Sequence, residues 1–347
     1  MKARLELHTL RFRTPLVTAR GPMKERSGFV VQLEHEGVIG RGEARPWEAF
    51  GTESLVACQA ALEAWQLVRV PETVEEIDAA LASVVGTPSA RFALECALLE
   101  LLSLRKNRSI AQLLGVELPK SISVSALLDG DSSEALCLSA ERAVADGFRT
   151  LKLKVAAHGL STDAQRLAEL RRVVGANVAI RIDANGGWSE GMARSALRGL
   201  ESLNLELCEQ PVAAGDVEAL RRVRRLVPCR IAADEALLVP GGAEKVLAND
   251  PRPAAEVLVL KPMALGGLRP ALALAHTAQQ RGVSAYVTTL LDGPLARAAA
   301  VVLAQALHGT WAHGVATVEG FEGQQVDRFT PHAGSIRPWV EPGWGLS

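Results

Sequence analysis

Five charged residues recur along this 347-residue chain at intervals of 25 to 29 residues, and each ends a short apolar run. They are Lys154, Asp183, Glu209, Asp234 and Lys261. Burying an ionised side chain is costly unless the charge is paired or coordinated. A single residue of this kind could belong to a structural ion pair, but five in consecutive positions of a repeat indicate a shared site.

The three carboxylates of this set would form an oxygen-rich site with a charge of −3. Mg²⁺ prefers carboxylate and water oxygens in octahedral geometry, so it suits these donors. No His or Cys recurs with Asp183, Glu209 and Asp234, which disfavours zinc. The expected cofactor is therefore Mg²⁺, with Mn²⁺ as the alternative.

Two lysines, Lys154 and Lys261, flank the carboxylates in the repeat. A free ammonium has a pKa of about 10.4 and is a poor base at neutral pH. Lys152 lies two residues before Lys154, on the same face of a strand, and its charge, a divalent cation and partial burial would lower the pKa of Lys154. A lysine tuned in this way can remove a proton α to a carboxylate, and a metal would stabilise the resulting enediolate.

The elements that must position these residues are alternating strands and helices. Strand patterns cover residues 121–128, 150–155, 178–184, 205–212, 229–237, 256–262 and 283–289. Helical patterns, such as 164–174, 191–202 and 217–227, lie between these strands. Such repetition predicts parallel βα units but does not separate a barrel from an open sheet. No GxGxxG motif follows the first strand, so a dinucleotide site is not supported.

The first ~115 residues differ in style, because strand patterns (2–12, 28–35 and 38–44) precede helical ones. This order predicts a small α+β domain. If the later strands form a parallel barrel, their carboxyl ends meet at one mouth, where the charged residues would converge.

Composition excludes several classes of protein. A formal net charge of −1 argues against nucleic-acid binding. Five scattered cysteines without a CxxC pair disfavour a disulfide scaffold, and no apolar run is long enough to span a membrane. The N-terminus lacks the apolar run of a signal peptide. We therefore expect a soluble, cytoplasmic protein that acts on a small-molecule carboxylate; a homo-oligomer is left open, since barrel enzymes often associate.

The order of the motifs resembles the enolase superfamily, muconate-lactonising subgroup. The motifs are KxK (152–154), DxN (183–185), EQP (209–211), DE (234–235) and KPxxxGG (261–267). The resemblance implies an α/β fold, a modified TIM barrel of the (β/α)7β type with an N-terminal α+β capping domain. The expected boundaries are 1–115 for the capping domain, 116–320 for the barrel and 321–347 for a segment that returns to the capping domain.

Within this subgroup, four segments most resemble the o-succinylbenzoate synthases of menaquinone biosynthesis: 13–28, 44–55, 259–267 and 287–309. The resemblance implies a lyase that dehydrates 2-succinyl-6-hydroxy-2,4-cyclohexadiene-1-carboxylate by syn elimination. Lys154 would remove the α-proton and protonate the departing hydroxyl, Lys261 would stabilise the enediolate, and Lys152 would tune Lys154. Asp183, Glu209 and Asp234 would bind Mg²⁺, with Asn185 and Glu235 supporting the site from outside.

Two alternatives stay open. The same lysines could serve an N-acylamino-acid or dipeptide racemase or epimerase, with each lysine working on one face of the α-carbon. However, residues 316–322 (ATVEGFE) lack the DxD pattern of dipeptide epimerases. The chain could also be a catalytically silent homologue, although an idle site would retain several costly buried charges.

Candidate substrate-binding residues come from two regions. Segment 14–28 is expected to form a loop that closes over the barrel, where Arg20 and Lys24 would contact a second substrate carboxylate; an ordinary exposed hairpin loop is an equally good interpretation. Gly266, Thr288 and Thr289 lie at or after strand ends of the barrel and complete the set. Glu43 and Arg45 are expected to belong to ion pairs between the two domains rather than to the catalytic residues.

Overall fold

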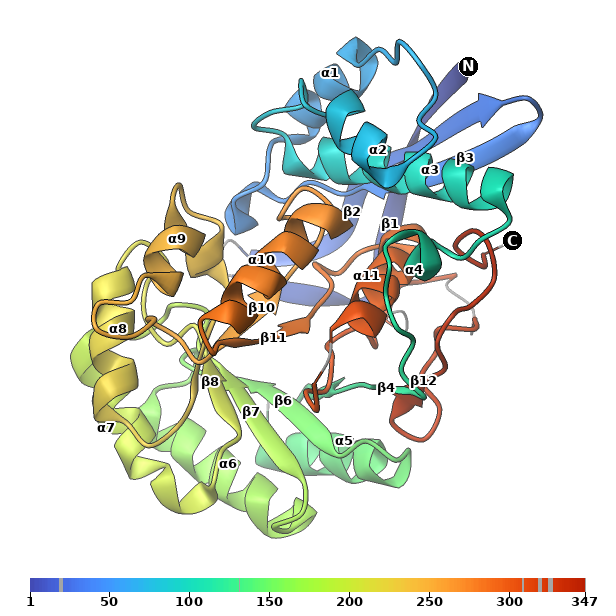
Figure 1. The fold of residues 1–347 in the computed structure, drawn as a ribbon. Helices are drawn as coiled ribbons and strands as arrows, with labels where there is room; N and C mark the ends of the chain where they lie inside the picture. The colour runs from blue at the N-terminus through green and yellow to red at the C-terminus, as the bar shows by residue number, and fades with distance from the viewer. Residues whose placement is uncertain (19–20, 131, 308, 318–319, 324–326, 347) are drawn as a thin grey trace.

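The computed structural model describes residues 1–18, 21–130, 132–307, 309–317, 320–323 and 327–346. It has two parts, a small sheet with its helices above a larger curled sheet that is surrounded by helices (Figure 1). None of the helices described is both long enough and apolar enough to cross a membrane.

The small sheet is antiparallel with strand order β1-β2-β3. Its strands are β1 (Lys2–Thr18), β2 (Gly21–His35) and β3 (Val38–Ala44). The segment expected as a loop at 14–28 is therefore mostly strand, which corrects that expectation. Its residues pair across a hairpin, as Leu16 does with Met23. Both faces of residues 21–25 are partly or fully exposed, so no alternating apolar pattern marks this strand.

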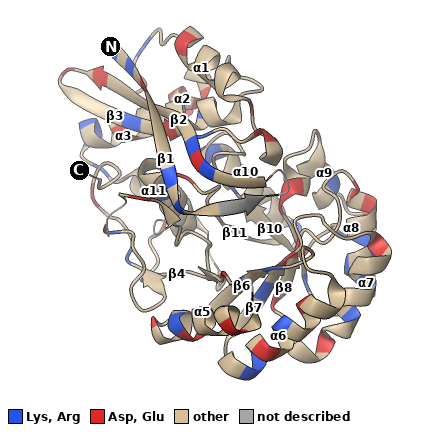
Figure 2. Ribbon diagram, turned by 180° about the vertical axis from the view of Figure 1, so that it is seen from behind, with Lys and Arg blue, Asp and Glu red and all other residues tan. Residues whose placement is uncertain are grey.

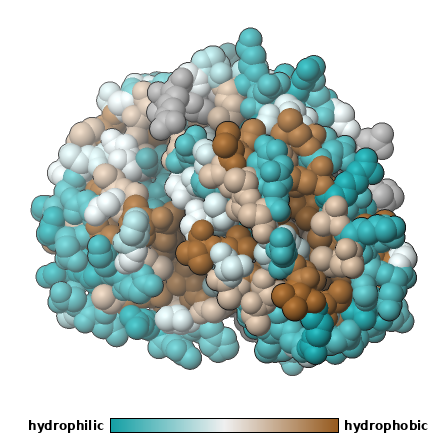
Figure 3. All heavy atoms as spheres, turned by 90° about the horizontal axis from the view of Figure 1, so that it is seen from above, coloured by the Kyte–Doolittle hydropathy of each residue, from teal (hydrophilic) through white to brown (hydrophobic). Residues whose placement is uncertain are grey.

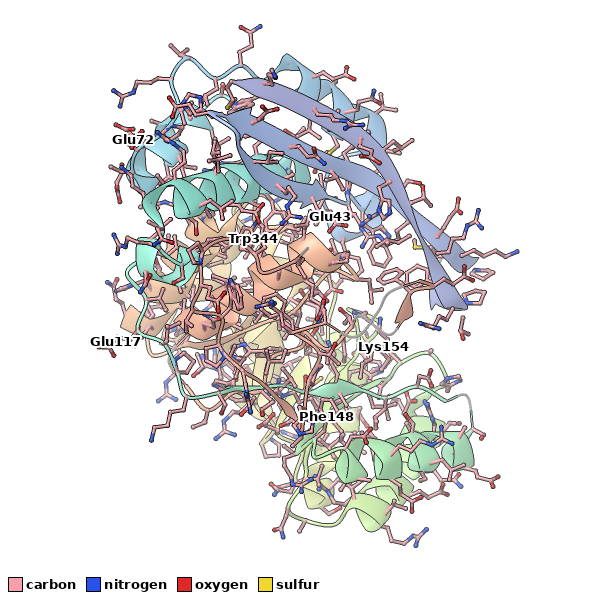
Figure 4. All side chains as sticks on the ribbon, turned by 90° about the vertical axis from the view of Figure 1, so that its right-hand side faces the viewer. Glu43, Glu72, Glu117, Phe148, Lys154 and Trp344 are labelled. Carbon is pink, nitrogen blue, oxygen red and sulfur yellow. The ribbon has the colours of Figure 1, made fainter. Side chains whose placement is uncertain are left out.

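Three helices belong to this part: α1 (Leu55–Ala64), α2 (Val74–Ala80) and α3 (Pro88–Lys106). Helix α3 packs on β2 and β3, and α2 packs on α3. Glycine allows α3 to lie directly on β3, since a Cβ at Gly42 would be only 1.9 Å from the carbonyl oxygen of Ala93. The indole of Trp344, near the C-terminus, donates to the carbonyl of Arg41 at 2.9 Å. The end of the chain thus packs against the small sheet, and Figure 4 shows Trp344 between the two parts of the molecule.

The larger sheet has seven parallel strands in the order β11-β10-β9-β8-β7-β6-β5. They are β5 (Ala126–Leu127), β6 (Thr150–Lys154), β7 (Ala179–Asp183), β8 (Leu207–Glu209), β9 (Ile231–Ala233), β10 (Val257–Leu260) and β11 (Ser284–Val287). Each lies within a predicted strand segment. The predicted α/β fold class, a barrel-like parallel sheet with an N-terminal capping domain, is confirmed.

A short segment joins the two edges of this curled sheet. His313 forms a parallel bridge with Val124, beside β5, and Gly314 forms one with Thr288, just after β11. The Ser125 amide donates to the His313 carbonyl at 2.9 Å, and the Gly314 amide donates to the Val287 carbonyl at 2.8 Å. Residues 313–314 therefore take the place of the eighth strand of a barrel.

Helices alternate with these strands on the outside of the barrel. They are α5 (Ser133–Ala145), α6 (Leu160–Val174), α7 (Glu190–Gly199), α8 (Val217–Leu226), α9 (Gly242–Leu247), α10 (Leu268–Gln280) and α11 (Pro294–Ala306). Side-chain N-caps start several of them, such as Ser189 for α7 and Asp216 for α8. Much of the charge lies on the outer helices (Figure 2). Viewed from above, polar residues dominate the periphery and hydrophobic ones gather toward the middle (Figure 3).

Short elements complete the fold. They are the helix α4 (Ile110–Leu113), the 3₁₀ turns η1 (Glu48–Phe50), η2 (Glu201–Leu203) and η3 (Glu235–Leu237), and the antiparallel pair of β4 (Ile122–Ser123) and β12 (Ser335–Ile336). Inside the barrel, a small apolar layer formed by Leu207, Ala232, Val257, Val259 and Tyr286 supports the strand ends above it.

Candidate active site

The five recurring charged residues meet at one end of the barrel. Strand register places Lys154 opposite Asp183, and Asp183 opposite Glu209. Asp234 directly follows β9 and Lys261 directly follows β10. All five line one cavity, which confirms that the repeat brings them together.

Two lysines form ion pairs with the carboxylates. The Lys152 ammonium lies 2.8 Å from Asp183 Oδ2 and 2.7 Å from Glu209 Oε1, and Lys261 pairs with Asp234. Burial alone would lower the pKa of Lys152, but Asp183 and Glu209 outweigh it and hold that pKa well above its ordinary value. Burial also acts to lower the pKa of Lys261, but the carboxylate of Asp234 acts to raise it. The pKa of Lys261 is therefore above its ordinary value.

The two flanking lysines differ in their surroundings. Lys154 is exposed at the end of β6, and no described residue forms a hydrogen bond or ion pair with its ammonium. Figure 4 places it below the β1–β2 hairpin. Lys261 is only 7% exposed, and its Nζ lies 5.3 Å from the ring centre of Phe50. Within the described part of the chain, Lys154 is therefore unpaired at the cavity, whereas Lys261 is held by an ion pair.

The sequence motifs did not identify two residues that support the carboxylates. The hydroxyl of Tyr286, on β11, donates to Glu209 Oε2 at 2.6 Å, and the Arg181 guanidinium lies 4.5 Å from the tyrosine ring centre. Gln210 accepts from the backbone amides of Asp234 (3.1 Å) and Ala236 (3.0 Å) through Oε1. The EQP motif contains Gln210, whereas only its inward position on a strand could have indicated Tyr286.

Asn185 and Glu235 lie beside the carboxylates, as a supporting role requires. Asn185 Nδ2 donates to Glu235 Oε1 at 3.0 Å, and the Asn185 amide donates to Asp183 Oδ1 at 2.9 Å. The backbone of Asn185 is in the left-handed region (φ 43°), which asparagine tolerates better than most residues. Their contribution to catalysis stays a prediction.

The predicted substrate-binding residues divide into three groups. Thr288 and Thr289 line the cavity, and the hydroxyl of Thr289 lies 2.9 Å from that of Thr317. Gly266 and Lys24 are not among the described lining residues: the Gly266 carbonyl accepts from Arg91 of α3 at 2.6 Å, and Lys24 is exposed on β2. Their assignment as substrate-binding residues stays a prediction. Arg20 lies outside the described residues.

The three carboxylates fit a divalent cation by their chemistry. They offer only oxygen donors at neighbouring strand ends, and Asp234 Oδ1 is buried without a hydrogen-bond partner among the described groups. Burial also raises the pKa of Asp234, with Lys261 opposing it. Within the described residues, however, no three His, Cys, Asp or Glu side chains are already arranged to hold a metal ion, and lysines occupy several carboxylate oxygens instead. The ligand assignment stays a prediction.

An apolar wall faces this charged floor. It comprises the side chains of Trp47, Phe50, Leu290 and Leu291, which line the same cavity. The first two follow the small sheet and the last two follow β11, so both parts of the molecule contribute. Nearby, Glu43 pairs with Arg45 and accepts from the Ala296 amide of α11 at 3.2 Å. The ion pair therefore lies within the N-terminal part, which corrects the expectation, and the contact with the barrel helix is a hydrogen bond.

Two family profiles match the chain. One, described as "Mandelate racemase / muconate lactonizing enzyme, N-terminal domain", matches residues 3–115, and the other, "Enolase C-terminal domain-like", matches residues 135–347. Curated relatives cover most of the chain. N-succinyl-L-Arg/Lys racemase of Bacillus cereus is 27% identical over 85% of this chain and 81% of its own length. Muconate cycloisomerase 1-1 of Acinetobacter lwoffii is 33% identical over 76% of this chain and 70% of its own.

Solved structures agree with these relatives. The B. cereus N-succinyl Arg/Lys racemase superposes with a TM-score of 0.91 at 25% identity, over 99% of this chain and 94% of that one. A substrate-liganded L-Ala-D/L-Glu epimerase from Bacillus subtilis gives 0.90 at 26% identity, over 99% and 98%. A dipeptide epimerase from Methylococcus capsulatus, complexed with Mg and the dipeptide L-Arg-D-Lys, gives 0.86 at 26% identity, over 99% and 98%.

The chain therefore belongs to the enolase superfamily, in its mandelate racemase and muconate lactonizing group, and the expectation that it is an enzyme is supported. The predicted superfamily and subgroup are confirmed. These relatives are a racemase, two epimerases and a cycloisomerase, so they favour the alternative function over the o-succinylbenzoate synthase expectation. They do not show a lyase.

Proposed function

We propose that this enzyme racemises or epimerises an N-acylated amino acid by moving the proton on its α-carbon, with Mg²⁺ as cofactor. One observation carries the proposal: Lys154 and Lys261 reach a single cavity from strands on either side of Asp183, Glu209 and Asp234. The similarity to racemases and epimerases, one of them a complex with Mg and a dipeptide, supports it.

The roles follow from the positions of the side chains. Asp183, Glu209 and Asp234 would hold Mg²⁺, which when bound supplies a Lewis acid for the substrate carboxylate. Lys154, as the neutral amine, would take the α-proton from one face, and the Lys261 ammonium would deliver a proton to the opposite face. The reverse direction exchanges the two roles, so both enantiomers are substrates.

An N-acyl group fits better than the free ammonium of a dipeptide. Residues 316–322 lack the DxD pattern of dipeptide epimerases, and the described cavity residues of this stretch are Ala316 and Thr317. Neither of these two described side chains can neutralise an ammonium; Glu319, in the same stretch, lies outside the described residues. We therefore propose an amide nitrogen on the substrate, as in the name of the B. cereus racemase.

Syn dehydration of the o-succinylbenzoate synthase type is the second candidate, because of the asymmetry of the lysines. That reaction needs one acid/base and one fixed cation. Lys154 is unpaired among the described residues and faces the cavity, whereas Lys261 is buried and paired with Asp234. This arrangement would serve a single proton carrier.

Exchange of the α-proton in D₂O tests the proposal. Both enantiomers of N-succinyl and N-acetyl amino acids are incubated with Mg²⁺-loaded enzyme, and deuterium uptake is followed by NMR. Lys154→Ala should lower exchange of one enantiomer about 10²–10⁴-fold and Lys261→Ala that of the other, as expected for loss of a general base. Lys120→Ala, at an exposed position, is the matched control.

The outcomes separate the candidates. Exchange without inversion, together with formation of o-succinylbenzoate from its cyclohexadiene precursor, would support the dehydratase and contradict the racemase. Absence of both activities would leave the catalytically silent homologue, and Lys154→Ala would then change no measurable property of the protein other than its charge.

A further inference from the structure

Arg26 is a buried arginine that connects the β1–β2 hairpin to the barrel. It is 4% exposed, and its guanidinium donates to the carbonyls of Leu290 and of Leu291, the latter at 2.9 Å. It also donates to the Arg45 carbonyl at 2.5 Å. The hydrogen bonds therefore reach both the segment after β3 and the segment after β11.

The segment after β11 needs such support. Leu291 has a φ of 54°, in the left-handed region that a leucine rarely adopts. Conformations of this kind persist only where the surroundings hold them. Arg26 binds the carbonyl of this residue, and Asp292 binds the amide of Leu290 at 2.9 Å from the other side.

The same guanidinium stacks on a second part of the cavity wall. It lies 4.8 Å from the ring centre of Trp47, a distance typical of a cation–π contact. Trp47, Leu290 and Leu291 all line the cavity. One side chain thus fixes three apolar groups that come from two separate segments.

The groups around Arg26 occupy its guanidinium. Asp292 lies 3.9 Å from it, and Arg45 and Glu43 act on it electrostatically. With its nitrogens bound to backbone carbonyls and its face on Trp47, Arg26 does not serve as a partner for a substrate carboxylate. Its contribution is to hold the wall in place.

We propose that Arg26 is a positioning residue that fixes three members of the apolar wall, Trp47, Leu290 and Leu291, and that this wall selects substrates with an apolar α-side chain. The second part rests on the proposed function. A wall of an indole and two leucine side chains offers a desolvated surface to a side chain such as that of leucine; the two leucines can compensate no polar group, and the indole offers a single N–H donor.

Substrate selectivity of the full-length, Mg²⁺-loaded enzyme tests the proposal. Initial rates are compared for N-acetyl-leucine, N-acetyl-asparagine and N-acetyl-alanine. The wild type should prefer leucine over asparagine, of similar size, by roughly 10- to 200-fold in kcat/KM. Arg26→Met should remove about 10-fold or more of this preference, mainly through KM for the leucine substrate, while the alanine substrate changes far less.

Three further variants separate positioning from simple destabilisation. Arg26→Lys should not rescue, because an ammonium cannot reach several carbonyls as the guanidinium fork does. Trp47→Ala removes part of the wall directly and should reproduce the loss of preference even if Arg26→Met folds poorly. Arg4→Met, at an exposed position on the same hairpin, should leave all rates unchanged.

Hydrogen exchange gives a readout that needs no substrate. In Arg26→Met, the amides of residues 289–292 should exchange faster while those of α6 keep their wild-type rates. Equal loss of rate for all three substrates, or unchanged exchange at 289–292, would overturn the proposal. If no N-acyl amino acid exchanges its α-proton with the wild type, the proposed function fails instead, and hydrogen exchange alone decides the role of Arg26.

Discussion

Replacing Tyr286 with phenylalanine should weaken metal binding without altering any proposed ligand. Tyr286 is the sole tyrosine of the chain and is 1% exposed, and its hydroxyl lies 2.6 Å from Glu209 Oε2. A buried hydrogen bond to a charged group contributes about 1.5–3 kcal/mol. The substitution removes that bond and leaves the carboxylate oxygen without this donor.

The loss divides between two measurable quantities. Part of it lowers the stability of the metal-free protein, since the hydrogen bond exists there already, and only the part that orients the metal-bound carboxylate lowers affinity. Outer partners of metal ligands typically contribute 10- to 100-fold in affinity. We expect the lower end for Tyr286→Phe, about 10-fold or 1.4 kcal/mol.

The assay titrates Mn²⁺ and follows the free ion by electron paramagnetic resonance, with Mg²⁺ as competitor. Ser103→Ala is the matched control: it deletes a buried hydroxyl that bonds the Arg108 carbonyl, remote from the carboxylates, and should lower stability but not affinity. Fluorotyrosine labelling adds a direct probe, because a sole tyrosine gives one ¹⁹F signal, which should shift on addition of Mg²⁺. An unchanged affinity in Tyr286→Phe, or a ¹⁹F signal insensitive to Mg²⁺, would refute the reasoning.

Three other predictions follow from separate features. Removing divalent ions with EDTA should abolish α-proton exchange, and Mg²⁺ should restore it; activity that survives EDTA would contradict a metal-dependent site. Burial lowers the pKa of His313 to about 4, and its Nδ1 accepts from the Val287 amide, so the imidazole stays neutral in the folded state. In the unfolded chain the same imidazole has a pKa of about 6.5 and takes up a proton below that pH. Stability should therefore fall as the pH falls from about 6.5 toward 4, and urea unfolding should show the wild type losing about 2 kcal/mol more than His313→Asn between pH 7.5 and 5. Gly42→Ala should cost about 1–3 kcal/mol or more and lower the Tm, since its methyl group would meet the Ala93 carbonyl, whereas Gly191→Ala, with open space around it, should not.

The parallel strands were predictable because strands buried on both faces read as continuous apolar runs, although the repeat alone did not distinguish a barrel from an open sheet. Each apolar run therefore indicated a strand, and the charged residue that ends the run indicated the carboxyl end of that strand. The hydrogen-bonded strands are shorter than these runs: β8 and β9 have three residues each, within predicted segments of eight and nine. Apolar residues continue beyond the last ladder bond, so the pattern overestimates strand length.

The β1–β2 hairpin and the eighth strand position were not predictable in the same way. Residues 21–25 have no buried face that would produce alternation, and residues 313–314 form single bridges too short to leave a periodic pattern. Gly266 shows a different limit. Its motif suggested substrate binding, which stays a prediction, and its carbonyl bonds Arg91 of α3, a long-range partner that spacing does not encode.

Arg26 and Tyr286 show why part of the site stayed hidden. Arginine is normally exposed, so the sequence predicts a solvated side chain for a charged residue on a hairpin. Arg26 is nevertheless buried, because backbone carbonyls of two distant segments accept hydrogen bonds from its nitrogens. Tyr286 reads as a core residue, and its hydroxyl becomes meaningful only once β11 lies near β8. Both depend on contacts between residues far apart in the sequence.

Lys152 takes on a different meaning in the structure. The motif suggested that its charge tunes Lys154, which stays a prediction; in the structure that charge lies within 2.8 Å of two carboxylates. The same ammonium holds Asp183 and Glu209 at one position although both are anions, and Lys261 accompanies Asp234 in the same way. Carboxylates that repel one another are thus kept at the floor of the cavity by lysines. This explains how three buried anions can coexist where no described cluster is yet arranged as a metal site.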